Sequence, residues 1–303
     1  MEIKYGKQVD SKDISGIDIS LMLLAGNHEE RVYTAYNKIS INNNVLKTVV
    51  LCYNNSFNLD YSKKIEKKTI KNHKEISSIL NDEFLNNTSQ DINIVVDYSC
   101  MTKSWYYTII LYLKEKKLDI NSITVFFTYT PSKYSKPQLP KTNTEIAPLP
   151  GKYVVPTDKP KALIVCLGYE QNKAQGIIEH LDPKICFIYY SKPALDKNFV
   201  ETIELNNKDI LEKDNNVITF PLEDLIFLEK DLTALYYSLR NEYSVIIAPL
   251  GPKPFSFISM LMSIKYNDID IWRVGSGSDI NMYTREPLDN NSFIISKVVF
   301  HDN

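Results

Sequence analysis

Basic residues recur at matching positions in the two halves of this 303-residue chain. Arg31 lies five residues after Gly26, and Lys173 lies five residues after Gly168. Each pair follows an apolar run and precedes an amphipathic stretch. A cationic side chain beside a helix N-terminus favours anions, because the helix dipole and the first backbone N–H groups attract negative charge. The spacing therefore indicates two candidate anion sites, while a solvated helix face remains the alternative.

A second pair of loops carries a lysine followed two residues later by an aromatic residue. These are Lys103 with Trp105 in the first half and Lys253 with Phe255 in the second. Hydroxyl groups and glycines near such lysines would let a phosphate or carboxylate approach the backbone closely. The remaining candidates for ligand contacts, all in loops after apolar runs, are Ser99, Thr102, Gly251 and Ser276. Ser99 or Thr102 could equally cap a helix, which is a purely structural role.

If the protein is an enzyme, Asp97 and His28 are the candidates for acid–base chemistry. Asp97 ends an apolar run, and His28 lies in the first candidate loop. The sequence contains no GxSxG, HExxH, P-loop or GxGxxG motif, each of which would name a reaction or cofactor. Catalysis is therefore an open question at this stage.

Short apolar runs alternate with stretches of helical period in both halves of the chain. This alternation predicts parallel βαβ units and hence an α/β fold of two Rossmann-like domains, each with a doubly wound, mainly parallel sheet. The predicted strands cover residues 19–25, 46–53, 92–97 and 123–129, and then 162–167, 185–190, 217–220, 244–248 and 269–274. The predicted helices cover residues 28–40, 73–86 and 102–117, and then 171–181, 197–207, 222–240 and 253–265.

A proline-rich stretch separates the halves and predicts the domain boundary. Proline interrupts helices and central strands, so we expect residues 131–160 to form a linker or an extended arm. The expected domains are then residues 1–130 and 161–303. The matching basic positions favour an internal duplication, and the alternative is two unrelated Rossmann-like domains.

The composition narrows the classes of partner and site. A formal net charge of -2 provides no overall field for steering nucleic acid, so nucleic acid is not an expected partner. One basic run recurs at helical spacing, comprising Lys63, Lys64, Lys67, Lys68, Lys71 and Lys74. The four cysteines are scattered, and we expect neither a metal site nor a cofactor. Without an apolar leader or a membrane-length segment, we expect a cytoplasmic protein.

In its general plan, a duplicated Rossmann-like chain with basic loops at symmetric positions resembles the nucleotide-sensing domains of the CARF and SAVED type. Those domains hold cyclic oligonucleotides across a pseudo-twofold axis. The resemblance implies a binding or sensor protein for an anionic, nucleotide-like molecule held between the halves, in signalling or antiviral defence. The alternatives are a transferase or hydrolase acting on a nucleotide or sugar-nucleotide in the same cleft, and a scaffold that engages a protein through the proline-rich arm.

Overall fold

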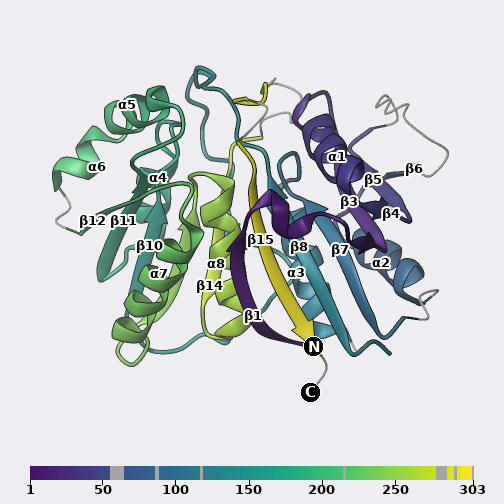
Figure 1. The fold of residues 1–303 in the computed structure, drawn as a ribbon. Coiled ribbons are helices and arrows are strands. Elements are labelled where there is room, and N and C mark those ends of the chain that lie inside the picture. The colour runs from purple at the N-terminus through teal and green to yellow at the C-terminus, as the bar shows by residue number, and fades with distance from the viewer. Residues whose placement is uncertain are drawn as a thin grey trace. The chain divides into compact units, whose positions relative to one another are not determined.

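The computed structural model describes residues 1–54, 65–85, 89–116, 119–213, 216–277, 285–289 and 292–301. It confirms the predicted α/β class, with sheets of mainly parallel strands and helices between them (Figure 1). The chain divides into two compact units. Unit 1 combines Met1–Lys133 with Asn281–Asn303, and unit 2 is Tyr134–Ile280. None of the helices in the described residues is long and apolar enough to cross a membrane.

Unit 1 is built on a seven-stranded sheet with the order β1-β15-β8-β7-β3-β5-β6. Its strands are β1 (Glu2–Val9), β3 (Leu21–Gly26), β5 (Thr48–Cys52), β6 (Ile65–Thr69), β7 (Asp91–Asp97), β8 (Ser122–Tyr129) and β15 (Ile294–His301). Its other elements are a 3₁₀ helix (Ser11–Ile14), α1 (Arg31–Asn42), α2 (Glu75–Leu85), α3 (Lys103–Glu115), and the short strands β2 (Asp18–Ile19) and β4 (Asn44–Val45).

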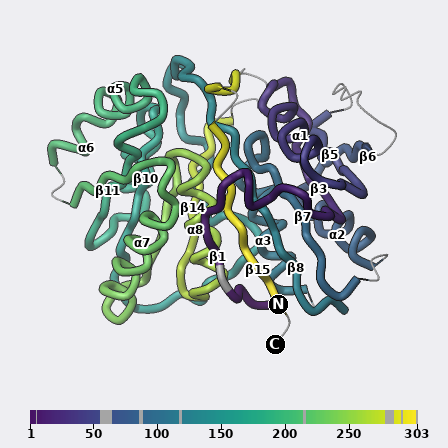
Figure 2. Tube along the Cα trace, viewed as in Figure 1, coloured from purple at the N-terminus to yellow at the C-terminus, as the bar shows by residue number. Residues whose placement is uncertain are grey.

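The five parallel strands of unit 1 follow the order 3-2-1-4-5 when they are numbered along the chain from β3. This order reverses between β3 and β7, which is where open α/β sheets bind ligands at their carboxyl ends. Every residue of β3 is buried, because helices cover both faces of a parallel sheet. Beyond β8 the sheet continues with two antiparallel strands, so that β1 and β15, near the two ends of the chain, lie side by side (Figure 2).

Unit 2 contains a six-stranded sheet with the order β12-β11-β10-β13-β14-β9. Its strands are β9 (Glu145–Pro148), β10 (Lys161–Cys166), β11 (Ile185–Ser191), β12 (Val217–Phe220), β13 (Ser244–Pro249) and β14 (Asp270–Gly275). Its helices are α4 (Lys173–Leu181), α5 (Lys197–Asn206), α6 (Lys208–Lys213), α7 (Leu225–Leu239) and α8 (Lys253–Lys265). The parallel strands again follow the order 3-2-1-4-5, and β9 adds an antiparallel edge beside β14.

Each predicted strand and helix overlaps an observed element. The observed strands that were not predicted include β6, which is mostly polar, and β1 and β15, which lie near the ends of the chain. The structure places β15 in the sheet of unit 1, whereas we expected residues 161–303 to form one domain. Within the expected linker, residues 145–148 form the edge strand β9. An edge strand can contain proline, because its backbone needs hydrogen bonds to a neighbouring strand on one side only.

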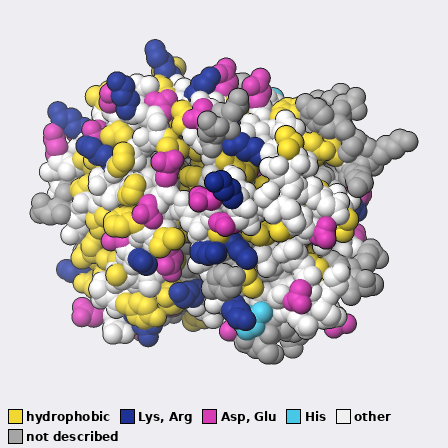
Figure 3. All heavy atoms as spheres, viewed as in Figure 1, with side chains coloured by type: hydrophobic (Ala, Val, Ile, Leu, Met, Phe, Trp, Pro, Cys, Tyr) yellow, Lys and Arg dark blue, Asp and Glu magenta, His cyan; other side chains and the backbone are white. Residues whose placement is uncertain are grey.

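The described part of the basic run does not form the helical face that its spacing predicted, since Lys67 and Lys68 lie in a strand. Residues 65–69 form the edge strand β6, in which successive side chains alternate between faces. Lys68 pairs with Glu66, which also contacts Lys47. Lys63 and Lys64 lie outside the described residues. On the face seen in Figure 3, basic and acidic side chains are interspersed.

Two glycines allow the loops of unit 2 to meet where the strand order reverses. A Cβ added to Gly168 would lie 2.6 Å from the carbonyl oxygen of Leu250. A Cβ added to Gly251 would lie 2.5 Å from Cys166 Sγ and 2.6 Å from the carbonyl oxygen of Leu167. The loops after β10 and β13 are thus in direct contact. Their backbones approach so closely that only glycine fits at these two positions.

We predict that Gly168→Ala and Gly251→Ala each destabilise the protein by about 1–3 kcal/mol, because the added methyl group overpacks the contact between backbones. The control is Gly6→Ala, since a Cβ there would meet its nearest neighbours at 3.8 Å. Urea denaturation followed by circular dichroism measures the change. Equal stabilities of all three variants would contradict the close approach.

Lys152 fastens the proline-rich stretch to the end of α8. Its Nζ donates hydrogen bonds to the carbonyl oxygens of Ser263, at 2.6 Å, and Ile269, at 2.8 Å. Burial lowers the pKa of Lys152 to about 8, although Asp270 and Asp268 oppose this shift. The ammonium group is therefore held in the fold at an electrostatic cost.

This lowered pKa gives stability a defined pH dependence. Between about pH 8 and the ordinary lysine pKa of 10.5, the unfolded chain binds more protons at Lys152 than the folded chain does, so the free energy of unfolding rises with pH. We predict that Lys152→Met removes this rise, whereas Lys159→Met, at an exposed position, retains it. Urea titrations at pH 7, 8, 9 and 10 test the prediction. A constant difference between wild type and Lys152→Met would refute it.

Candidate functional site

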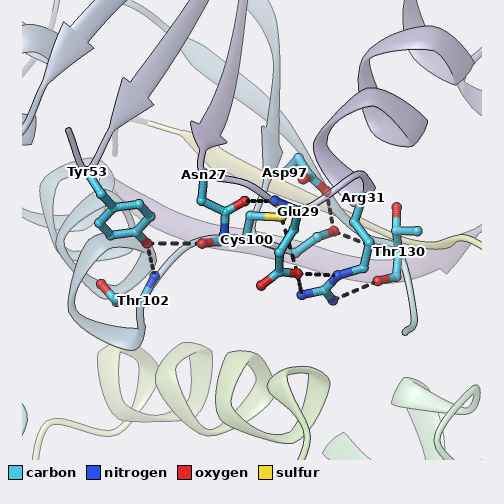
Figure 4. A network of polar contacts seen from close by, with 9 residues as sticks. Asn27, Glu29, Arg31, Tyr53, Asp97, Cys100, Thr102 and Thr130 are labelled. Atoms are coloured by element: carbon cyan, nitrogen blue, oxygen red, sulfur yellow. Dashed lines mark hydrogen bonds and ion pairs between the residues drawn. The ribbon is translucent and has the colours of Figure 1, made fainter. Parts of the chain in front are cut away.

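Buried polar side chains gather at the carboxyl edge of the unit 1 sheet, where the strand order reverses (Figure 4). They come from the loop after β3, the loop after β7 and the end of β8. The members that are less than a tenth exposed are Asn27, Glu29, Arg31, Asp97, Ser99, Thr128 and Thr130. Burying so many polar groups is costly unless they bond to one another. We call this set the polar cluster.

Arg31 and Glu29 form a buried ion pair at the start of α1. Arg31 Nε donates a hydrogen bond to Glu29 Oε2 at 2.7 Å, and Nη2 pairs with the same oxygen. Arg31 Nη1 donates to the carbonyl oxygen of Thr130 at 3.1 Å, and thereby ties α1 to the end of β8. Asn27 Oδ1 accepts a hydrogen bond from the backbone N–H of Glu29, which shapes the loop between β3 and α1.

Electrostatics keep this arginine charged despite its burial. Burial lowers the pKa of Arg31, but interactions with Cys100, Glu29 and Tyr129 outweigh it and raise the pKa above its ordinary value. Arg31 is 1% exposed, so its guanidinium bonds to groups inside unit 1. Glu29 supplies the compensating charge that a buried cation requires.

A chain of hydroxyl groups links the ends of β7 and β8. Ser99 Oγ donates to Asp97 Oδ1 at 2.7 Å and accepts a hydrogen bond from the backbone N–H of Thr130 at 2.7 Å. Thr128 Oγ1 donates to the same carboxylate oxygen at 3.1 Å. Asp97, Ser99 and Thr130 are fully buried. The carboxylate of Asp97 therefore organises two loops from inside the unit.

Tyr53 holds the loop between β7 and α3. Its hydroxyl donates to the carbonyl oxygen of Cys100 at 3.0 Å and accepts from the backbone N–H of Thr102 at 2.8 Å. The Tyr53 ring stacks on Trp105, with ring centroids 4.0 Å apart. Burial raises the pKa of Tyr53 well above its ordinary value, so the hydroxyl remains a donor. These contacts fix the start of α3.

The starts of α3 and α8 correspond closely. Lys103 and Lys253 are the first helical residues, and each is half-buried. The preceding residues, Thr102 and Pro252, have extended backbones and make no side-chain cap hydrogen bond. Neither helix has an acidic residue in its first turn. The aromatic residue two positions after each lysine, predicted from the repeated pattern, is buried and anchors the helix to its unit.

The remaining predicted ligand residues of unit 2 lie in three places. Gly168 lies at the loop contact described above, and Asn207 Nδ2 donates to its carbonyl oxygen at 3.0 Å. Lys173 begins α4 and pairs with Glu170. Ser276 follows β14 and is half-buried. Ser278 and Asp279, which follow it closely in the chain, lie outside the described residues.

The structure thus joins some candidates and separates others. Arg31, Asp97 and Ser99 belong to one hydrogen-bonded cluster, with Gly26 ending the neighbouring strand. His28 is exposed on the loop between β3 and α1. Four members of the polar cluster are not among the candidates selected from the sequence, namely Asn27, Glu29, Thr128 and Thr130. Asn27 and Thr130 share one signal, because each is a polar residue directly after a buried strand.

The polar cluster is a framework that holds loops in place. Among the described residues, no group of three or more His, Cys, Asp or Glu side chains is placed to hold a metal ion. Asp97 is fully buried and accepts two hydroxyl hydrogen bonds, which suits positioning of the loops. The loop that Asp97 and Ser99 hold leads into α3, which begins at Lys103.

Comparison with known proteins adds no family to this description. The sequence matches no protein-family model and no curated protein.

We predict that Glu29→Gln destabilises the protein by about 3–5 kcal/mol, because it leaves the Arg31 charge buried without compensation. The double variant Glu29→Leu with Arg31→Met should lose less than the sum of the two single changes. The control is Glu286→Gln, which breaks the surface pair of Lys133 (55% exposed) and Glu286 (61% exposed) and should cost less than about 1 kcal/mol. Denaturation in urea measures these differences. A Glu29→Gln variant as stable as the control would contradict the buried pair.

Proposed function

We propose that this protein binds an anionic, nucleotide-like small molecule at the carboxyl edges of its parallel sheets and acts as a binding or sensor protein. The observation that carries this proposal is the cation at the start of each helix that follows the first and fourth parallel strands. In unit 1 these are Arg31 and Lys103, and in unit 2 they are Lys173 and Lys253.

A cation at a helix N-terminus opposes the helix dipole, so folding alone does not favour it. Other helices of the same chain place a carboxylate at their start. Asp224 caps α7 by accepting a backbone hydrogen bond, and α2 carries Glu75 in its first turn. Helix α5 also begins with a lysine, Lys197, but its cap residue Asp196 accepts a backbone hydrogen bond and places a negative charge beside it. The contrast supports a role for the basic starts in attracting an anion, because the cation and the helix N-terminus then act together on the same negative charge.

The four cations are not equivalent, and the two lysines at α3 and α8 are the better ligand contacts. Arg31 is 1% exposed, which keeps its guanidinium inside unit 1, whereas Lys103 and Lys253 are half-buried. The starts of α3 and α8 also match each other, because an extended residue precedes each lysine, whereas Asn172 before Lys173 has a left-handed backbone. We therefore assign an anionic group of a bound ligand to the start of α3 in unit 1 and, separately, to the start of α8 in unit 2.

The nucleotide-like character of the ligand is inferred from architecture. The strand order 3-2-1-4-5 in both sheets is the order in which many α/β proteins bind nucleotides at the carboxyl edge. We propose that the two units are Rossmann-like and arose by duplication, as in the CARF and SAVED sensors that the sequence plan resembles. A cytoplasmic role in signalling or antiviral defence belongs to the same proposal.

Ligand binding can be tested with the purified full-length protein. Native mass spectrometry detects any retained nucleotide, and thermal shift screening then compares mono-, di- and cyclic nucleotides. Lys103→Ala and Lys253→Ala should each weaken binding about tenfold to a hundredfold, since a hydrogen bond to a charged group contributes about 1.5–3 kcal/mol. The matched controls are Lys114→Ala and Lys265→Ala, which remove a lysine from the last turn of the same helices. Binding that survives both first-turn substitutions would overturn the proposal.

A further inference from the structure

Three aromatic side chains meet at the carboxyl edge of the unit 2 sheet. Tyr169 follows β10, Phe199 lies in the first turn of α5, and Tyr134 comes from the proline-rich stretch. Their ring centroids are 5.2–6.4 Å apart, at interplanar angles of 57–81°. All three are half-buried. We call them the aromatic cluster.

Hydrogen bonds hold the backbone and one ring of this cluster in place. Asn206 Nδ2 donates to the carbonyl oxygen of Tyr169 at 2.6 Å. The backbone N–H of Tyr134 donates to the cap residue Asp196 at 2.9 Å, and the Tyr134 hydroxyl lies 2.8 Å from Thr202 Oγ1. Rings held in this way lose little conformational freedom when a ligand binds them, which favours affinity.

The loop that carries Tyr169 touches the loop that leads into α8. Tyr169 directly follows Gly168, whose Cα is packed against the carbonyl group of Leu250. Lys253 lies three residues after Leu250, and three residues of chain span at most about 11 Å. A small molecule with an anionic group at α8 and a flat ring at the aromatic cluster would therefore contact both through adjoining loops of one unit.

The ring geometry distinguishes this cluster from the aromatic packing at the same edge of unit 1. In unit 1, Tyr53 and Trp105 stack face to face at an interplanar angle of 13°, and Trp105 is 5% exposed. In unit 2, Tyr169 and Phe199 meet at 63°, so the edge of one ring covers the face of the other. Tyr169 also packs against the apolar core of unit 2. All three residues are only half-buried, which leaves part of each side chain accessible to a further π-system.

We propose that the aromatic cluster stacks the nucleobase of the bound molecule, so that the ligand is a base-bearing nucleotide rather than a simple phosphate or carboxylate. This inference rests on the proposed function, because it assigns the anionic end of the same ligand to Lys253. Stacking on aromatic side chains accepts any base, since every base has a π-face. The cluster therefore accounts for selection of nucleotides as a class.

The test compares AMP and GMP with ribose 5-phosphate, which carries the same phosphate without a base. Isothermal titration of the full-length protein measures all three. Phe199→Ala and Tyr169→Ala should each weaken AMP and GMP binding by at least about fivefold and leave ribose 5-phosphate unchanged. Phe199→Tyr, which retains a ring, should restore binding. The matched control is Tyr237→Ala, in a separate cluster with Tyr236 and Tyr266, which should change none of the three affinities.

The outcomes separate this inference from the proposed function. If Lys253→Ala weakens all three compounds while the aromatic variants weaken AMP and ribose 5-phosphate equally or not at all, nucleobase stacking is wrong and anion binding stands. If the aromatic variants act on AMP and GMP alone while Lys253→Ala has no effect, stacking stands and the assignment of the anion is wrong. If the wild-type protein binds none of the three, both are overturned.

Discussion

The burial of the parallel strands on both faces is the constraint from which the rest of the structure follows. In β3 every residue is buried, and β10 is buried except at its first residue. Such strands have no room for reactive side chains along their length, so polar groups collect where the strands end. The reversal of strand order between the first and fourth strands then brings two of these ends together with two helix starts.

The two units satisfy this constraint in different ways. Unit 1 fills the reversal point with side chains whose charges and hydroxyl groups bond to one another, centred on Arg31 and Asp97. Unit 2 closes the same point with backbone, because Gly168 and Gly251 have no Cβ to separate the loops. A rigid reversal point is common to both solutions, and in both it fixes where the following helix begins. Equivalent starts for α3 and α8 thus arise from unlike local chemistry.

How much the sequence predicts depends on the strength of its apolar pattern. Buried strands such as β3 and β10 were predicted within a few residues, because a continuous apolar run bounded by turns has few alternatives. The edge strand β6 was missed since its residues, Ile65–Thr69, are mostly polar and half-exposed. The place of β15 in the first sheet depends on pairing with β8 from a distant part of the chain, and no local pattern encodes that pairing.

The same reasoning explains which site residues the sequence identifies. Lys103 and Lys253 are local features, since a basic residue after a strand and before a helix is visible in the chain itself. The burial of Arg31 is visible only in three dimensions, because it depends on the carbonyl group of Thr130, ninety-nine residues away in the chain. A buried cation that neutralises a nearby carboxylate and a half-buried cation at a helix start look alike in sequence. The long-range contact places Arg31 in the buried framework of unit 1, whereas Lys103 and Lys253 are half-buried at the starts of α3 and α8.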